Sequence, residues 1–255
     1  MTSAGQSSAL LLLLLDSRSP AGAHGHSGGM EAAVTAGFVT GVADVERFCR
    51  FRLRTSGQVA AAFAAVACQL WLAGSRPDRS GGAAPADPAP GGDAARWAEL
   101  DAEFSARAPS AAARTASRQL GSGLRRLVRA MVPGADLALP WQRIQWPAPH
   151  HPLVLGAAVA IAGGDARLAG LAAALGTCTV PASAAVRLLG LDPYAVQAVL
   201  AGLSAEIDAT GVAGARFAPA DGEIPVFGEL PALAGPALEL LADVHARAEV
   251  RLFAS

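Results

Sequence analysis

Alanine constrains the fold of this chain more than any other residue, because it supplies much of an apolar fraction that reaches 52% of the sequence. Alanine has the highest helix propensity and buries little area per residue. Strand-forming residues are scarce: aromatic residues amount to 5%, and β-branched residues rarely occur in runs. The chain is therefore expected to build helices rather than a β-sandwich or a wide parallel sheet.

Larger apolar side chains recur at helical spacing in several segments. Val45, Phe48, Cys49 and Leu53 stand at i, i+3, i+4 and i+8, which places them on one face of a helix. A comparable stripe runs from Val196 to Ile207. The sequence predicts an all-α fold, a single-domain bundle of about nine or ten helices with no sheet.

Three segments are expected to lie outside the packed core of this single domain, which spans residues 1–255. They are a disordered tail at residues 1–7, a mobile loop at residues 74–93 and a C-terminal tail at residues 249–255. Residues 74–93 are rich in proline and glycine, so they could alternatively link two domains. A loop is favoured because the 73 residues before it are too apolar to stand alone.

The charged residues exclude several classes of function. The formal net charge is −1, so the basic excess typical of a nucleic-acid binder is missing. All twenty basic residues are arginine. Without lysine the chain has neither a P-loop Gly-Lys-Ser/Thr motif nor a Schiff-base lysine. Any nucleotide hydrolysis associated with this protein must therefore belong to a partner.

Cysteines and apolar runs predict a soluble, cytoplasmic protein. Cys49, Cys68 and Cys178 are far apart and set among apolar residues, which is typical of reduced, partly buried thiols. The leucine run Leu10–Leu15 has no basic residue before it and is followed at once by Asp16 and Arg18, so it does not resemble a signal peptide. It is also too short to span a bilayer, which takes about 20 apolar residues.

The segment Pro20–Glu31 contains four glycines, two histidines and a serine, and three interpretations of it are open. Residues 25–29 satisfy the G-x-S-x-G pattern of a nucleophile elbow, with Ser27 as the nucleophile. His24 and His26 could chelate a divalent metal, although two ligands are fewer than a stable site needs. The segment could instead be a structural loop that leads into a helix, with Glu31 in its first turn, where the helix dipole favours a carboxylate.

The elbow interpretation is the weakest of the three. An elbow needs a β-strand that leads directly into it, and residues 19–24 cannot form one. Its strand would also lie inside a parallel sheet, which the rest of the chain does not supply. Ser27 is therefore expected to be a hydrogen-bonding residue of a loop and not a nucleophile.

Two further groups of residues are candidates for partner contacts. His245 lies on an apolar helix face, where a histidine is usually a packed residue, and the tail after it carries the apolar residues Leu252 and Phe253, which need to be covered by something. Four arginines share one flank of a predicted helix, either as a solvated face or as a site for an acidic partner. These are Arg114, Arg118, Arg125 and Arg129.

Four segments together resemble the urease accessory protein family UreF. Residues 14–34 resemble its N-terminal signature SP-x-G-x-x-x-x-S-x-G-x-E, and residues 250–255 resemble its closing RLF-x-S. The middle is similar over residues 97–104 with 117–121, and over residues 150–156 with 184–189. Three departures stand out: family members often have His-Glu at His245-Ala246 and Leu-Gly-Gln at 189–191, and Pro181 falls where they have a helix.

The resemblance implies an all-helical protein that dimerises and catalyses no reaction itself. Such proteins bridge the accessory protein UreD, also called UreH, and the nickel-carrying GTPase UreG, and they modulate GTP-dependent nickel delivery to the urease apoprotein. No cofactor is expected to bind stably, because nickel is handled by the complex, and no residue is assigned as catalytic or as a metal ligand. The alternatives are a serine hydrolase that uses residues 25–29 and a histidine-based nickel metallochaperone.

The two signature regions supply the residues expected to contact partners. They lie at opposite ends of the chain and are expected to order on binding. The candidates are His24, His26, Ser27, Glu31, His245, Arg251, Leu252 and Phe253.

Overall fold

A computed structural model describes residues 8–16, 25–75, 93–135, 148–218, 225–247 and 252–253. Over these ranges the chain is helical and contains no strand, which confirms the predicted all-α bundle. Two of the candidate contact residues, His24 and Arg251, lie outside the described residues. So do residues 1–7, residues 76–92 of the predicted loop, and most of the predicted C-terminal tail.

The helices follow one another with short connections wherever the structure describes them. Their bounds are α1 Ser8–Leu15, α2 Met30–Thr35, α3 Val42–Arg52, the π-helical turn η2 Leu53–Gly57, α4 Gln58–Gly74, α5 Ala94–Ala106, α6 Ala111–Met131, α8 His151–Ile161, α9 Ala166–Leu189, α10 Pro193–Gly202, α11 Ser204–Ala215, the 3₁₀ turn η3 Phe227–Glu229 and α12 Pro236–Ala246.

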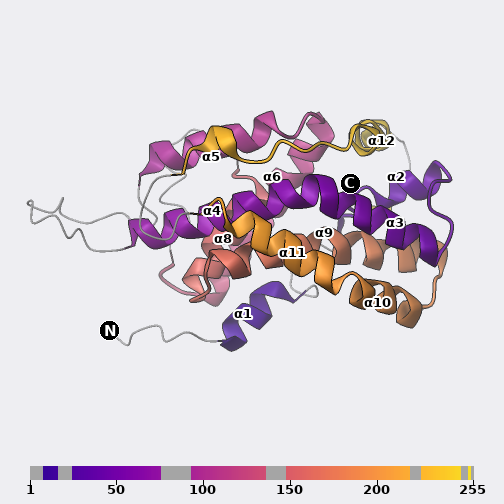
Figure 1. Ribbon diagram of the computed structural model, residues 1–255, viewed down its shortest axis with the longest axis horizontal. Coiled ribbons are helices and arrows are strands. Elements are labelled where there is room, and N and C mark those ends of the chain that lie inside the picture. Colours follow the sequence, from indigo (N-terminus) through magenta and orange to yellow (C-terminus); the bar gives the residue numbers. More distant parts are fainter. Residues whose placement is uncertain are drawn as a thin grey trace, which may run out of the picture.

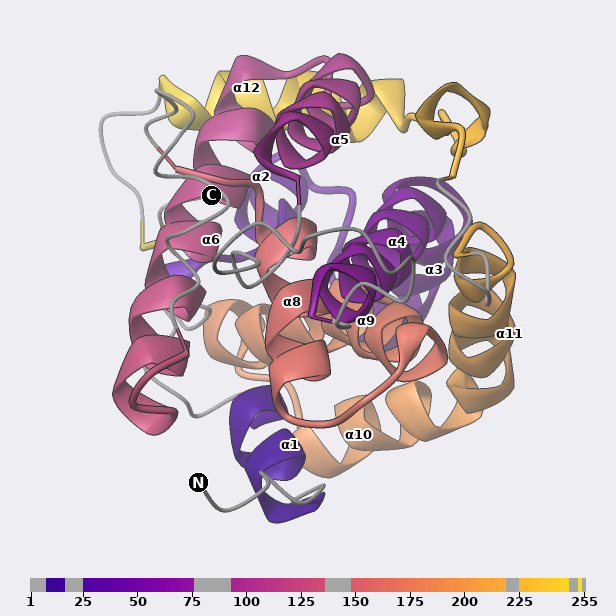
Figure 2. The same cartoon turned by 90° about the vertical axis from the view of Figure 1, so that its left-hand side faces the viewer.

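The helices α4, α8 and α9 form the centre of the bundle, and the other helices surround them (Figures 1 and 2). Helix α11 packs along α4 and α9, while α6 packs on the other side of α8. Helix α12 crosses one end of the bundle, where it contacts both α2 and α6 (Figure 1). This crossing brings the C-terminal part of the chain next to the N-terminal part.

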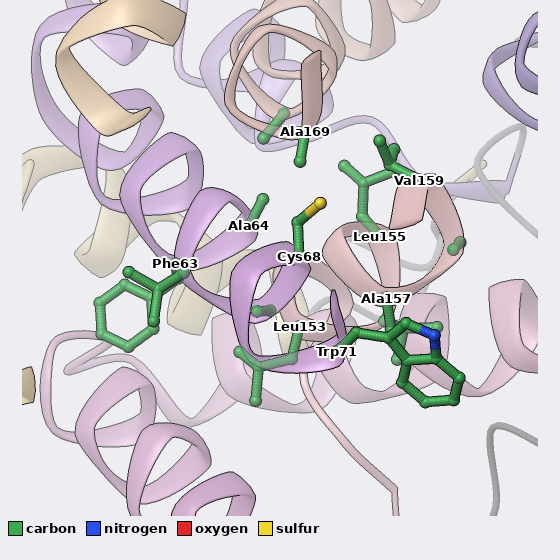
Figure 3. Packing of buried hydrophobic residues seen from close by; sticks show 14 of the residues in the cluster. Phe63, Ala64, Cys68, Trp71, Leu153, Leu155, Ala157, Val159 and Ala169 are labelled. Carbon is green, nitrogen blue, oxygen red and sulfur yellow. The ribbon is translucent and has the colours of Figure 1, made fainter. Parts of the chain in front are cut away.

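Small residues let the central helices approach one another closely. A side chain at Gly156 of α8 would place its Cβ 2.2 Å from the Ala64 carbonyl oxygen of α4, so only glycine fits there. Larger side chains then fill the remaining space: Figure 3 shows Leu153 and Trp71 beside alanines of the same helices. Glycine and alanine therefore allow the central helices to pack closely.

Two residues expected to interrupt helices do not do so. Low helix propensity predicts that Gly57 ends a helix, but α3 continues through η2 into α4. A Cβ atom at Gly57 would lie 2.9 Å from the Arg52 carbonyl oxygen and 3.3 Å from Thr177 Cγ2. A proline inside a helix is expected to kink or break it, and Pro181 does not break α9, which is continuous over 24 residues. Gly57 therefore serves close packing against α9, because tertiary contacts outweigh its low helix propensity.

Two helical stretches are long and apolar enough to cross a membrane by length and composition alone. They are Val42–Gly74 and Ala166–Leu189, and the bent pair α10–α11 would make a third. In the bundle, 61% of the most apolar window of each long stretch is buried inside the protein. Buried residues of α4 and α9 belong to the same hydrophobic core cluster.

Candidate functional site

The segment before α2 is a tight connection closed by two glycines. Gly28 and Gly29 have φ angles of 60° and 85°, a left-handed conformation that L-residues with a side chain rarely adopt. The Ser27 hydroxyl is fully buried and accepts a hydrogen bond from the backbone N–H of Glu31 (3.2 Å). Ser27 thus provides an acceptor for a backbone N–H in the first turn of α2 that has no partner within the helix, as expected of a hydrogen-bonding loop residue. The described residues contain no strand, and residues 17–24, which directly precede this connection, lie outside them.

Glu31 is buried, with 7% of its surface exposed, and its carboxylate holds the C-terminal segment. Oε1 accepts a hydrogen bond from the Leu252 backbone N–H (2.7 Å), and Oε2 accepts one from the Phe253 backbone N–H (2.9 Å). A carboxylate removed from water needs such donors, since leaving it unpaired costs several kcal/mol. Glu31 therefore joins residues that are more than 220 positions apart in the chain.

His245 of α12 completes this arrangement. Its Nε2 lies 3.3 Å from Glu31 Oε2, close enough for an ion pair when the imidazole is protonated, although the two atoms are not aligned for a hydrogen bond. The residues Ser27, Glu31, His245, Leu252 and Phe253 are called the Glu31 cluster below. Five of the eight residues predicted to contact partners thus come together in one place.

The two described tail residues point in different directions. Phe253 is 6% exposed, packs in the core with Met30 and Val45, and lies under the Arg187 guanidinium, whose Cζ is 4.3 Å from the ring centroid. Leu252 is 78% exposed. The sequence predicts that both apolar tail residues need to be covered, and the chain itself covers Phe253. Of the two described tail residues, Leu252 is the one exposed to another protein.

His26 lies on the wall of a neighbouring cleft of about 720 Å³. The segment before α2, α6, α9 and α12 line it, and His151 and His245 also reach its wall. Burial lowers the pKa of His26, and burial together with the charge of His26 lowers the pKa of His151 to about 4. Both imidazoles are therefore neutral near pH 7. The described residues contain no group of three or more His, Cys, Asp or Glu side chains placed to hold a metal ion.

The structure also contains a serine–histidine pair that the sequence did not reveal. Ser105 Oγ lies 2.8 Å from His150 Nε2, but the nearby Asp101 carboxylate accepts from the His150 backbone N–H (3.0 Å) and leaves the imidazole Nδ1 without a partner. Burial, with the nearby Arg118 and Arg114 charges, lowers the pKa of His150 to about 3. Such a weak base does not activate a hydroxyl, so this pair is structural.

Two of the four arginines on the α6 flank have structural roles. Arg118 forms an ion pair with the buried Asp101 (2.9 Å) and donates to the Ala148 carbonyl, which ties α6 to α5 and to the segment before α8. Arg114 donates to the carbonyl oxygens of Ala108 and Pro109 at the start of its own helix. The hypothesis of an acidic partner on this flank is therefore reduced to Arg125 and Arg129.

Comparison with known proteins identifies the family. The sequence model of the UreF family matches residues 39–204. The chain belongs to the UreF family. It is similar to the urease accessory protein UreF of Mycobacterium sp. (strain JLS), with 39% identity over 245 residues, 96% of this chain and 97% of the relative. The UreF of Mycobacterium marinum is 40% identical over 247 residues, 97% of this chain and 98% of the relative.

The match extends beyond the residues that the family model covers. The family model covers the segment from before α3 to the start of α11, whereas the UreF relatives align over nearly the whole chain. The UreF of Mycobacterium tuberculosis is 39% identical over 196 residues, 77% of this chain and 80% of the relative. The predicted UreF resemblance, which relied on both ends of the chain, is confirmed.

Proposed function

We propose that this UreF-family chain is a non-enzymatic adaptor that bridges UreD (UreH) and the GTPase UreG and modulates GTP-dependent nickel delivery to the urease apoprotein. Family membership establishes a urease accessory protein. Two properties of the chain support the adaptor role: the absence of lysine removes a P-loop, and the described residues lack a group of three metal ligands. Nickel is then the cargo of the complex and not a resident cofactor of this chain.

The Glu31 cluster is the observation that carries this proposal. It joins described residues of the N-terminal signature to described residues of the C-terminal signature, although nothing about a compact helical core requires the two to meet. The carboxylate orients the tail so that Phe253 is anchored and Leu252 is presented to solvent. An anchored backbone with one exposed apolar side chain is a preorganised contact for a partner protein.

We further propose that the protein is cytoplasmic and forms a homodimer. Reduced cysteines support the first point, because the described structure contains Cys49, Cys68 and Cys178 as free, buried thiols. Light scattering on the purified protein measures the second, with a dimer as the expected result.

Co-purification with UreD and UreG tests the adaptor role. The full chain, a chain that lacks residues 245–255 and a Leu252→Asp variant are compared. Leu252 is exposed, so its substitution leaves the fold intact and separates loss of contact from loss of folding. Tyr194→Asp on α10 is the matched control, since Tyr194 is 85% exposed and is not one of the cluster residues.

The full chain and the control are expected to retain UreD and UreG, and both tail variants are expected to lose at least one of them. Equal retention by all four proteins would remove the tail from the contact surface. A nickel titration distinguishes the adaptor from a metallochaperone: the adaptor alone shows no stoichiometric tight site. A tight site lost in His26→Ala would support the metallochaperone instead.

A further inference from the structure

Two cysteines that the proposed function does not use face each other across the bundle. Cys49 of α3 and Cys178 of α9 are both fully buried. Cys49 Sγ lies 3.6 Å from the Cys178 carbonyl oxygen, and Cys178 Sγ lies 3.8 Å from the Cys49 carbonyl oxygen. Each side chain therefore points at the backbone of the other residue.

This reciprocal arrangement is the one from which a disulfide can close. A disulfide needs two Cβ atoms that approach each other and Cα atoms within roughly 7 Å. Helices α3 and α9 pack directly against each other, and the small residue Gly57 keeps the following turn close to Thr177. The crosslink would join two segments that are already in contact.

The surroundings make one of the two thiols the better nucleophile. Interaction with the Cys178 thiol, and then the positive charge of Arg52, lower the pKa of Cys49 against the opposing effect of burial. Interaction with Cys49, together with burial, raises the pKa of Cys178. Arg52 also donates through Nε to the Thr177 carbonyl oxygen (3.3 Å), so its charge is held beside both cysteines. Thiolate character is what makes a cysteine reactive.

Cys68 provides a contrast within the same chain. Burial raises the pKa of its thiol to about 12, and its sulfur contacts the Gly164 carbonyl oxygen at 3.9 Å. Arg52 and Thr177 line the cleft described above, whereas Cys68 does not. The cleft therefore reaches Thr177, the residue before Cys178 in the sequence, although neither Cys49 nor Cys178 lines it.

We propose that Cys49 and Cys178 are a redox-modification site that closes to an intramolecular disulfide when the protein meets a hydroperoxide. The Cys49 thiolate attacks the peroxide, forms a sulfur–oxygen bond and releases hydroxide (or alkoxide). Cys178 then attacks the Cys49 sulfenic acid; the sulfur–sulfur bond forms, the sulfur–oxygen bond breaks, and water leaves with the Cys178 proton. The two sulfurs together lose the two electrons that reduce the peroxide, and a dithiol reductant reverses the reaction.

Peptide mapping after oxidation tests the proposal without any variant. The purified full-length protein is treated with hydrogen peroxide under native conditions, the remaining thiols are alkylated, and a protease digest is analysed by mass spectrometry. The expected product is a Cys49–Cys178 linked peptide pair, with a mass loss of about 2 Da for the two hydrogens. Cys68 is expected to stay reduced, and dithiothreitol is expected to restore all the thiols.

Variants and an unfolded sample sharpen this test. Cys68→Ser is expected to leave crosslink formation unchanged, whereas Cys49→Ser is expected to abolish it. Crosslinking is expected to be at least about tenfold slower in urea, because the native pairing and the Arg52 charge are then lost. Equal oxidation of all three cysteines, or crosslinking at the same rate in urea, would overturn the proposal. Because it does not rest on the adaptor role, failure of either proposal leaves the other standing.

Discussion

Replacing Glu31 by glutamine should release the C-terminal segment from the bundle. In the native protein the Glu31 carboxylate accepts one hydrogen bond from each of the Leu252 and Phe253 amides, at 2.7 and 2.9 Å. Hydrogen bonds to a charged group contribute about 1.5–3 kcal/mol each, so the two together contribute about 3–6 kcal/mol. Glutamine keeps one neutral acceptor, worth about 1 kcal/mol, and turns an NH₂ group toward the other amide, which cannot accept it.

The variant should therefore weaken the attachment of the tail by at least about 2 kcal/mol, which corresponds to a roughly 30-fold change in the equilibrium between attached and released tail. Native-state hydrogen exchange measured by mass spectrometry reports this change directly. The amides of the C-terminal peptide are expected to exchange about 30-fold faster in Glu31→Gln than in the wild-type protein. Peptides from the central helix α4 should exchange at unchanged rates.

A matched substitution separates this effect from a general loss of charge. Glu99→Gln on α5 removes an exposed carboxylate that pairs only with Arg96 at the surface, so it should leave tail exchange unchanged. If the tail amides of Glu31→Gln exchanged within a factor of about two of the wild-type rate, the carboxylate would not be what holds the tail. The role given to the Glu31 cluster would then be wrong.

Two further predictions concern the bundle itself. Gly156→Ala should lower the free energy of unfolding in urea by about 1–3 kcal/mol or more, because the new Cβ would meet the Ala64 carbonyl oxygen. Gly176→Ala should raise it by about 0.4–1 kcal/mol, because nothing lies within 4 Å of a Cβ there. Equal effects at both glycines would contradict the packing argument. His150 has a folded-state pKa of about 3, below its unfolded value, so its contribution is full above about pH 6.5 and falls by up to about 1.4 kcal/mol per pH unit as the pH drops toward 3. Urea titrations of wild type and His150→Gln between pH 7 and 4 check this, and identical slopes would contradict it.

The fold class could be predicted from the sequence because helix propensity and apolar spacing are local properties. The i, i+4 spacing of Glu46 and Arg50 favours an ion pair, and the structure contains one, with Arg50 Nη2 2.8 Å from Glu46 Oε1. The same local rules predict a helix end at Gly57 and a helix break at Pro181, and the structure shows neither. At these positions packing against distant helices decides the conformation, and local propensity does not take such tertiary contacts into account.

The candidate site was predictable in its parts but not in its assembly. Ser27 and Glu31 were singled out by the glycine-rich signature, and Phe253 by the apolar tail, yet no spacing rule connects residue 31 with residue 253. A usable signal was present in Glu31, because a carboxylate at the start of a largely apolar helix needs donors from elsewhere. Arg187 and the Ser105–His150 pair gave no such signal, since their contacts depend on how α5, α8 and α9 pack.

Reconstituted urease activation tests the central claim most directly. Urease apoprotein, UreD, UreG, nickel and GTP are combined with and without this chain, and urea hydrolysis is measured over time. The adaptor role predicts that active urease forms only when the chain is present, and that Leu252→Asp supports less activation than the Tyr194→Asp control. Equal activation in the presence and absence of the chain would contradict the claim that it is needed to deliver nickel.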